Sequence, residues 1–137
     1  MGEIFVRTEN SSASRLSWTG RIVSAVVVLA LLADAAVQLF APGMMHAEME
    51  LTGFPPGLTF ALGIIMLVCA ILYAIPRTVV LGAILVTGFL GGAICTHFRI
   101  GEIASPPQLI CLLLGAMTWG GLYLRNARLR TLLPLTS

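Results

Sequence analysis

Four long apolar stretches constrain this chain more than any other feature of its sequence. They cover residues 22–41, 58–75, 79–96 and 109–124. As helices, at about 1.5 Å rise per residue, they would be roughly 24 to 30 Å long, which is close to the thickness of the bilayer hydrocarbon. Of the 137 residues, 58% are hydrophobic and only 10% are charged, against about 25% charged in soluble domains. We therefore predict an all-α fold, an integral membrane four-helix bundle.

A soluble helical bundle is the main alternative, and it would need a polar stripe along each helix. Asp34 is the only charged side chain within the four stretches. A mid-helix carboxylate opposes membrane insertion by about 2.5 to 3.5 kcal/mol, whereas the Leu, Ile, Val and Phe residues from Ile22 to Phe40 favour it by roughly 3 to 7 kcal/mol. A cleaved signal peptide over residues 15–35 fits less well, because the apolar run resumes through Phe40.

The arginines predict an orientation for the four spans. Arg99 lies alone at one end of the spans, and seven arginines lie at the other end: Arg7, Arg15, Arg21, Arg77, Arg125, Arg128 and Arg130. Because basic residues concentrate on the cytoplasmic side, we expect both termini in the cytoplasm and the spans in a bacterial inner membrane.

This orientation divides the chain into three parts. Residues 1–21 form a cytoplasmic N-terminal tail, residues 22–124 the transmembrane domain, and residues 125–137 a basic cytoplasmic C-terminal tail. Pro106 and Pro107 can begin the last helix a turn before residue 109, because proline is tolerated in the first turn of a helix.

Five polar residues near the outer ends of the spans are the candidate site. Asp34 and Gln38 are four residues apart and so share a helix face. An acid at this depth in a membrane indicates function, and we assign Asp34 to proton exchange. His97 can titrate near neutral pH, and Arg99 supplies a fixed positive charge. With Thr96, these side chains could line one outward-facing pocket, with Asp34 and His97 catalytic and Gln38, Thr96 and Arg99 binding a ligand. The alternative is structural: Asp34 hydrogen-bonded to a neighbouring helix, and basic residues that only end the third span.

We expect no metal or haem in this chain. The three cysteines lie in separate apolar stretches without zinc-site or disulfide spacing. A haem with two histidine ligands would have to use His46 and His97, and residues 44–49 (Met-Met-His-Ala-Glu-Met) match a short interfacial helix better than a copper site. In that helix Glu48 would face water. The arginines do not form a basic stripe, so nucleic acid is not an expected partner.

Small residues on the third span suggest close helix contact. Gly88 and Gly92 are four apart, and we expect them to pack inside the bundle, although a homo-oligomer or another membrane protein could use the same ridge. Trp18, Tyr73 and Trp119 lie near the expected cytoplasmic boundary, where aromatic rings favour the headgroup region.

Several sequence segments resemble the DoxX-like family of small four-helix membrane proteins. They are Ile75-Pro-Arg-Thr, Leu81-Gly-Ala, and Thr-Gly-Phe-Leu-Gly-Gly-Ala-Ile-Cys-Thr-His-Phe-Arg-Ile-Gly over residues 87–101. Asp34-Ala-Ala-Val-Gln-Leu and Thr52-Gly-Phe-Pro-Pro resemble the family's first-helix acid and its loop. The chain departs from the family at Gln38, where members often carry lysine, and near Met66, where they carry an acid.

The resemblance implies a membrane-associated redox function, because the family takes its name from a subunit of a thiosulfate-oxidising, quinone-reducing complex. Our leading hypothesis is that the pocket binds a small lipophilic molecule such as a quinone. Whether the protein is an acid/base enzyme, a subunit of a quinone-linked oxidoreductase, a non-enzymatic assembly partner or a small proton-coupled transporter stays open at this point.

Overall fold

The computed structural model describes the backbone of residues 2–132 and the side chains of residues 14–132. The described part is helical and contains no strand, which confirms the predicted all-α fold. Its elements are α1 (Gly2–Phe40), the 3-10 helix η1 (Pro42–Met45), α2 (His46–Thr52), α3 (Leu58–Ala74), α4 (Val79–Arg99), α5 (Pro106–Arg125) and α6 (Ala127–Leu132).

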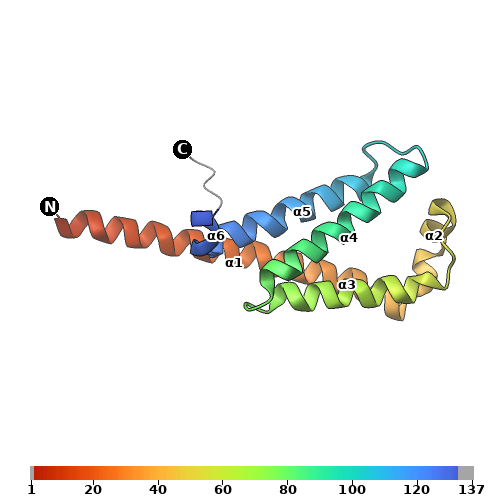
Figure 1. The fold of residues 1–137 in the computed structure, drawn as a ribbon, viewed down its shortest axis with the longest axis horizontal. Helices are drawn as coiled ribbons and strands as arrows, with labels where there is room; N and C mark the ends of the chain where they lie inside the picture. The colour runs from red at the N-terminus through yellow and green to blue at the C-terminus, as the bar shows by residue number, and fades with distance from the viewer. Residues whose placement is uncertain (1, 133–137) are drawn as a thin grey trace.

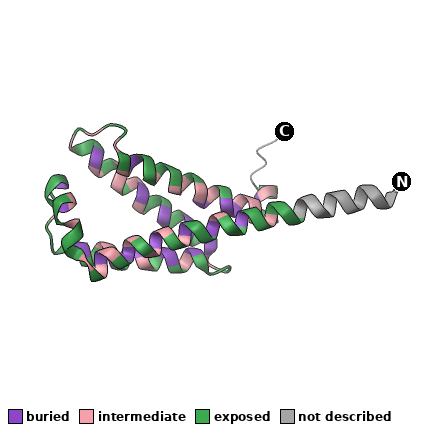
Figure 2. Ribbon diagram, turned by 180° about the vertical axis from the view of Figure 1, so that it is seen from behind, coloured by how far each residue is buried: buried purple, intermediate pink, exposed green. Residues whose placement is uncertain are grey.

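Three helical segments are long and apolar enough to cross a membrane. They are Ser14–Phe40 of α1, all of α4 and all of α5. Helix α3 is also apolar but has 17 residues, or about 26 Å at helical rise. Large apolar side chains lie exposed along all four of these helices, as expected for faces that contact lipid rather than water (Figure 2).

The four long helices pack in a ring. Helix α1 lies against α3 and α5, and α4 lies against the same two helices. The shared core includes Val27, Leu31, Ala70, Val86 and Leu122, each at most 1% exposed. Figure 1 shows α4 and α5 diverging from α1 and α3 toward the end that carries α2.

At the opposite end of the ring, glycines allow neighbouring helices to approach each other closely. A Cβ atom on Gly82 would lie 2.2 Å from the backbone nitrogen of Tyr73, so α3 and α4 touch backbone to backbone there. On α1 and α5, a Cβ on Gly20 would lie 2.7 Å from the Arg125 nitrogen, and one on Gly121 2.8 Å from the Ser24 hydroxyl. Only glycine permits these approaches, which hold the helices together where the two pairs begin to diverge.

The helix boundaries agree with the expected spans within a few residues, with two extensions. Helix α5 begins at Pro106, as predicted from the two prolines. Helix α4 continues past residue 96 to Arg99, and α1 begins at Gly2, so residues 2–21 prolong the first span as helix. The short helix expected around residue 46 is α2.

Two expectations about packing were wrong. Tyr73 is not at an interface: it is fully buried, its hydroxyl donates to the Thr118 carbonyl at 2.8 Å, and the Ser24 hydroxyl lies 3.1 Å away. Gly88 and Gly92 do not pack inside the bundle, because both are exposed and a Cβ at either would meet nothing within 4 Å. The glycine ridge faces outward because α4 contacts α3 and α5 through its other faces.

Candidate functional site

Asp34 and Gln38 form a hydrogen-bonded pair on α1. The Gln38 amide nitrogen Nε2 donates to Asp34 Oδ2 at 2.6 Å, across one helical turn. Asp34 is half-buried and Gln38 is only 5% exposed. The other end of the Gln38 amide, the carbonyl oxygen Oε1, is buried and accepts no hydrogen bond from the described residues. A buried acceptor without a hydrogen-bond partner destabilises a protein by about 1 to 3 kcal/mol, so a donor that bonded to this oxygen would be stabilising.

The neighbouring helices fix where this pair lies in the ring. Gln38 faces α3, because a Cβ on Gly63 would lie 3.0 Å from the Gln38 Cβ. Asp34 lies one turn earlier on α1, a helix that also packs against α5. Asp34 is six residues before the end of α1 at Phe40, or about 9 Å along the helix axis. The pair therefore lies inside the apolar part of α1, with Gln38 against α3.

This pair can present either an acceptor or a donor, depending on the proton of Asp34. When Asp34 is ionised it can only accept, so the amide nitrogen turns toward it and Oε1 is left to accept from another group. When Asp34 is protonated its O–H can donate to the amide oxygen, and after a half-turn of the amide the NH₂ group is left to donate. Uptake of one proton thus converts the available atom from an acceptor to a donor.

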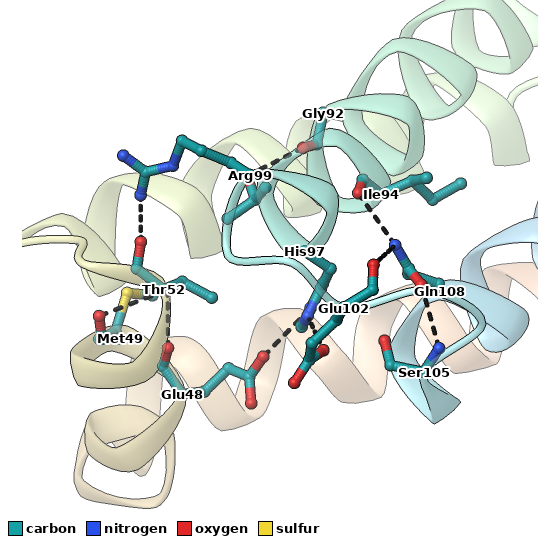
Figure 3. Close-up of polar contacts among 11 residues, drawn as sticks. Glu48, Met49, Thr52, Gly92, Ile94, His97, Arg99, Glu102, Ser105 and Gln108 are labelled. Carbon is teal, nitrogen blue, oxygen red and sulfur yellow. Dashed lines mark hydrogen bonds and ion pairs between the residues drawn. The ribbon is translucent and has the colours of Figure 1, made fainter.

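A second group of polar side chains lies at the end of the ring that carries α2, around His97. The ring nitrogen Nε2 of His97 lies 3.2 Å from Glu48 Oε1 on α2, and Nδ1 lies 2.8 Å from Glu102 Oε2 in the α4–α5 loop. Figure 3 shows the imidazole between the two carboxylates. A neutral imidazole can donate from one of these nitrogens, and an imidazolium can donate from both.

Arg99 makes a further link between α4 and α2. Its guanidinium Nη2 donates to the backbone carbonyl of Thr52, at the end of α2 (Figure 3). Helix α2 ends there because Gly53 adopts a left-handed conformation, with φ of 70°. His97 and Arg99 together tie α2 to the end of α4, across the divergence of the two helix pairs.

The α4–α5 loop is fixed by Gln108. The Gln108 side chain accepts from the Ser105 backbone N–H at 3.0 Å and donates to the Glu102 carbonyl at 3.2 Å. The hydrogen bond from His97 lowers the pKa of Glu102 below its ordinary value. The loop therefore keeps Glu102 ionised beside the His97 ring.

Four of the five predicted site residues fall into two groups. Asp34 and Gln38 pair with each other, and His97 and Arg99 contact α2 and the α4–α5 loop; the described residues show no hydrogen bond or ion pair that joins the groups. Thr96 donates to the Gly92 carbonyl of its own helix at 2.9 Å.

Sequence reasoning missed Glu48 and Gln108 as members of the group around His97. The expectation that Glu48 faces only water was wrong, because its carboxylate lies against His97 and is 38% exposed. Glu102 flanks His97 in the sequence, five residues later, and that spacing at a helix end was the available signal. No local pattern could link Glu48 to a residue 49 positions away.

The described side chains do not form a set of ligands suited to a metal ion or a haem. The side chains described here contain no group of three His, Cys, Asp or Glu residues that could hold a metal ion. Both ring nitrogens of His97 already face carboxylates, so an axial bond to iron would displace one of them. Met44 is exposed whereas Met49 is buried, so the two thioethers do not share a face.

The apolar helices and the polar pair buried among them define a helical membrane protein. The model of the DoxX-like family matches residues 22–121, which include all of α3 and α4, α1 from residue 22 onward, α5 up to residue 121, and both polar groups. The chain belongs to the DoxX-like family. Comparison with curated proteins and with solved structures found no match.

Proposed function

We propose that this DoxX-like protein binds a small lipophilic molecule, such as a quinone, within the membrane at Asp34 and Gln38. One observation carries the proposal: the buried carbonyl oxygen of Gln38 lacks a donor beside a carboxyl group at membrane depth. A quinol hydroxyl would donate to this oxygen when Asp34 is ionised. A quinone carbonyl would accept from the amide NH₂ when Asp34 is protonated. The pair is thus complementary to both forms of such a ligand.

We propose a structural role for His97 and Arg99, at the end of the ring that carries α2. His97 and Arg99 hold α2 at the outer end of the ring, and Thr96 lies on the turn before them. Both His97 ring nitrogens, the Thr96 hydroxyl and one Arg99 nitrogen already have protein partners, so the proposal assigns the ligand's head group to Asp34 and Gln38. Because no described hydrogen bond joins Asp34 to His97, the proposal needs bridging water to carry protons from Asp34 outward to His97 and its two carboxylates. Any electron transfer belongs to a partner protein.

The topology in this proposal has four crossings, with both termini in the cytoplasm of a bacterial inner membrane. Helix α3 serves as the second crossing, because it packs between α1 and α4 although it is shorter than they are. A crossing of this length is accommodated by local thinning of the bilayer. The distribution of the eight arginines supports the orientation.

Extraction of the purified protein with organic solvent, followed by mass spectrometry, tests the binding. We expect a stoichiometric lipophilic compound from the unchanged protein and much less from Asp34→Asn. Thr96→Val is the matched control, because Thr96 bonds only to its own helix, and it should retain the compound. An empty extract from all three proteins, or equal amounts from all three, would contradict the proposal.

The outward ridge on α4 favours a second candidate function, assembly with another membrane protein or a second copy of this chain. Gly88 and Gly92 leave open space where a helix could approach closely. Gly92→Leu should abolish co-purification of a defined partner. Gly120→Leu on α5 is the control, because Gly120 is equally open and exposed. If both variants still co-purify with the partner, the ridge is not the contact surface.

A further inference from the structure

Arg125, the last residue of α5, has a charge that is only partly satisfied. Its guanidinium carbon lies 5.5 Å from the centre of the Tyr73 ring, in cation–π range. The nitrogen Nη2 is buried and donates to no acceptor among the described residues. The side chain as a whole is half-buried, so part of it reaches the surface.

No described carboxylate balances this guanidinium. The acidic side chains that the structure describes are Asp34, Glu48, Glu50 and Glu102, which lie toward or at the α2 end of the ring. The ion pairs found among these residues all involve His97. A partly desolvated guanidinium without a counter-ion is costly, and the cation–π contact compensates only part of that cost.

The surroundings of Arg125 add positive charge. Gly20 packs on the Arg125 backbone nitrogen, which brings the next residue of α1, Arg21, to the end of α5. Helix α6 follows with Arg128 and Arg130, and Arg130 Nη1 donates to the Leu124 carbonyl at 3.2 Å. Helix α6 packs against α5 at this end (Figure 1). The end of α5 therefore carries the guanidinium groups of Arg125 and Arg130, and no described acid pairs with either.

We propose that Arg125 binds the phosphate of an anionic phospholipid headgroup. Arg125 ends an apolar helix, so its side chain lies at the level of the bilayer surface, where lipid phosphates are concentrated. The planar guanidinium matches two phosphate oxygens, and the Tyr73 ring holds it in place from the other side. The site is separate from the Asp34–Gln38 pair and does not depend on the ligand proposed there.

Titration of the purified chain in detergent micelles with phosphatidylglycerol, followed by native mass spectrometry, tests this site. We expect Arg125→Gln to weaken binding at least tenfold. Arg77→Gln, an exposed arginine on the α3–α4 turn, is the matched control and should weaken it no more than about fivefold, the effect of one surface charge. Arg125→Lys keeps the charge over Tyr73 but not the planar fork, so it should fold normally and bind between the unchanged protein and Arg125→Gln.

A parallel titration with inorganic phosphate distinguishes the two sources of the anion. Phosphatidylglycerol binding that depends on Arg125, with no binding of inorganic phosphate, identifies the lipid. Inorganic phosphate binding with the same dependence on Arg125 supports the phosphate site and assigns it to a free anion. Equal losses in Arg125→Gln and Arg77→Gln, or no loss in Arg125→Gln and Arg125→Lys, would overturn the proposal.

Discussion

Gly82 sets the distance between α3 and α4, and replacing it with alanine should destabilise the protein. The added Cβ would lie 2.2 Å from the Tyr73 nitrogen and 2.4 Å from its Cα. These are backbone atoms, so no side-chain rotation can relieve the contact. The helices would have to separate by roughly 1 Å to restore an ordinary contact distance, although a short turn joins them.

The expected cost follows from three contributions. Overpacking of this kind costs about 1 to 3 kcal/mol. Displacement of Tyr73 weakens its hydrogen bond to the Thr118 carbonyl, which is worth about 1 kcal/mol. The better helix propensity of alanine offsets about 1 kcal/mol. We therefore expect Gly82→Ala to lower the free energy of unfolding by about 1 to 3 kcal/mol.

Gly88→Ala is the matched control on the same helix. A Cβ at Gly88 meets nothing within 4 Å, so the substitution should leave the stability unchanged or raise it by up to about 1 kcal/mol. Thermal unfolding in detergent micelles, followed by helical circular dichroism, measures both variants. Equal stability of Gly82→Ala and Gly88→Ala would refute the close approach of α3 and α4.

Two further variants probe the polar contacts at the two ends of the ring. Glu102 has a lowered pKa in the folded protein, so its contact with His97 stabilises the fold above the ordinary carboxyl pKa and is lost as pH falls through the lowered value. The melting temperatures of the unchanged protein and Glu102→Gln should therefore converge at low pH, and a constant difference between about pH 3 and pH 7 would contradict this link. Tyr73→Phe should lower the free energy of unfolding by about 1 to 3 kcal/mol, because the Thr118 carbonyl and the Ser24 hydroxyl lose a buried partner; a denaturation curve like that of the unchanged protein would contradict it.

Hydropathy predicts the long helices well because lipid removes other options for the backbone. A chain inside hydrocarbon must pair its amide groups within each segment, so an apolar run of sufficient length indicates a helix. The proline pair at residues 106–107 likewise placed the start of α5, because proline restricts where a helix can begin. Extension of α1 to Gly2 was missed because residues 2–21 are not apolar, and the prediction followed hydropathy alone.

Side-chain partners across helices could not be predicted in the same way. Tyr73 lies near the end of an apolar run, where an interfacial position and a buried one give the same pattern. The rotation of α3 about its own axis decides between them. The outward direction of Gly88 and Gly92 has the same cause. A small-residue motif indicates that a close contact is possible and does not identify the partner.

The candidate site shows where local spacing is informative. Asp34 and Gln38 are one turn apart on a helix, so they were predicted to share a face. In the structure the two side chains are hydrogen-bonded to each other. A pocket shared with His97 required the relative positions of α1 and α4, which the sequence does not contain. The position of Glu48 depended on the fold of the α1–α3 connection, and Glu48 pairs with His97 because α2 lies beside the last turn of α4.

The proposal that a bound lipophilic ligand donates a hydrogen bond to the Gln38 carbonyl oxygen can be tested with Gln38→Met. Methionine has a similar length and removes the acceptor while Asp34 stays in place. Quantitative mass spectrometry of the co-purified lipophilic compound should show about one molecule per chain in the unchanged protein and clearly less in Gln38→Met, since loss of one hydrogen bond worth about 1.4 kcal/mol weakens binding about tenfold. Equal occupancy in a folded Gln38→Met protein would contradict the claim.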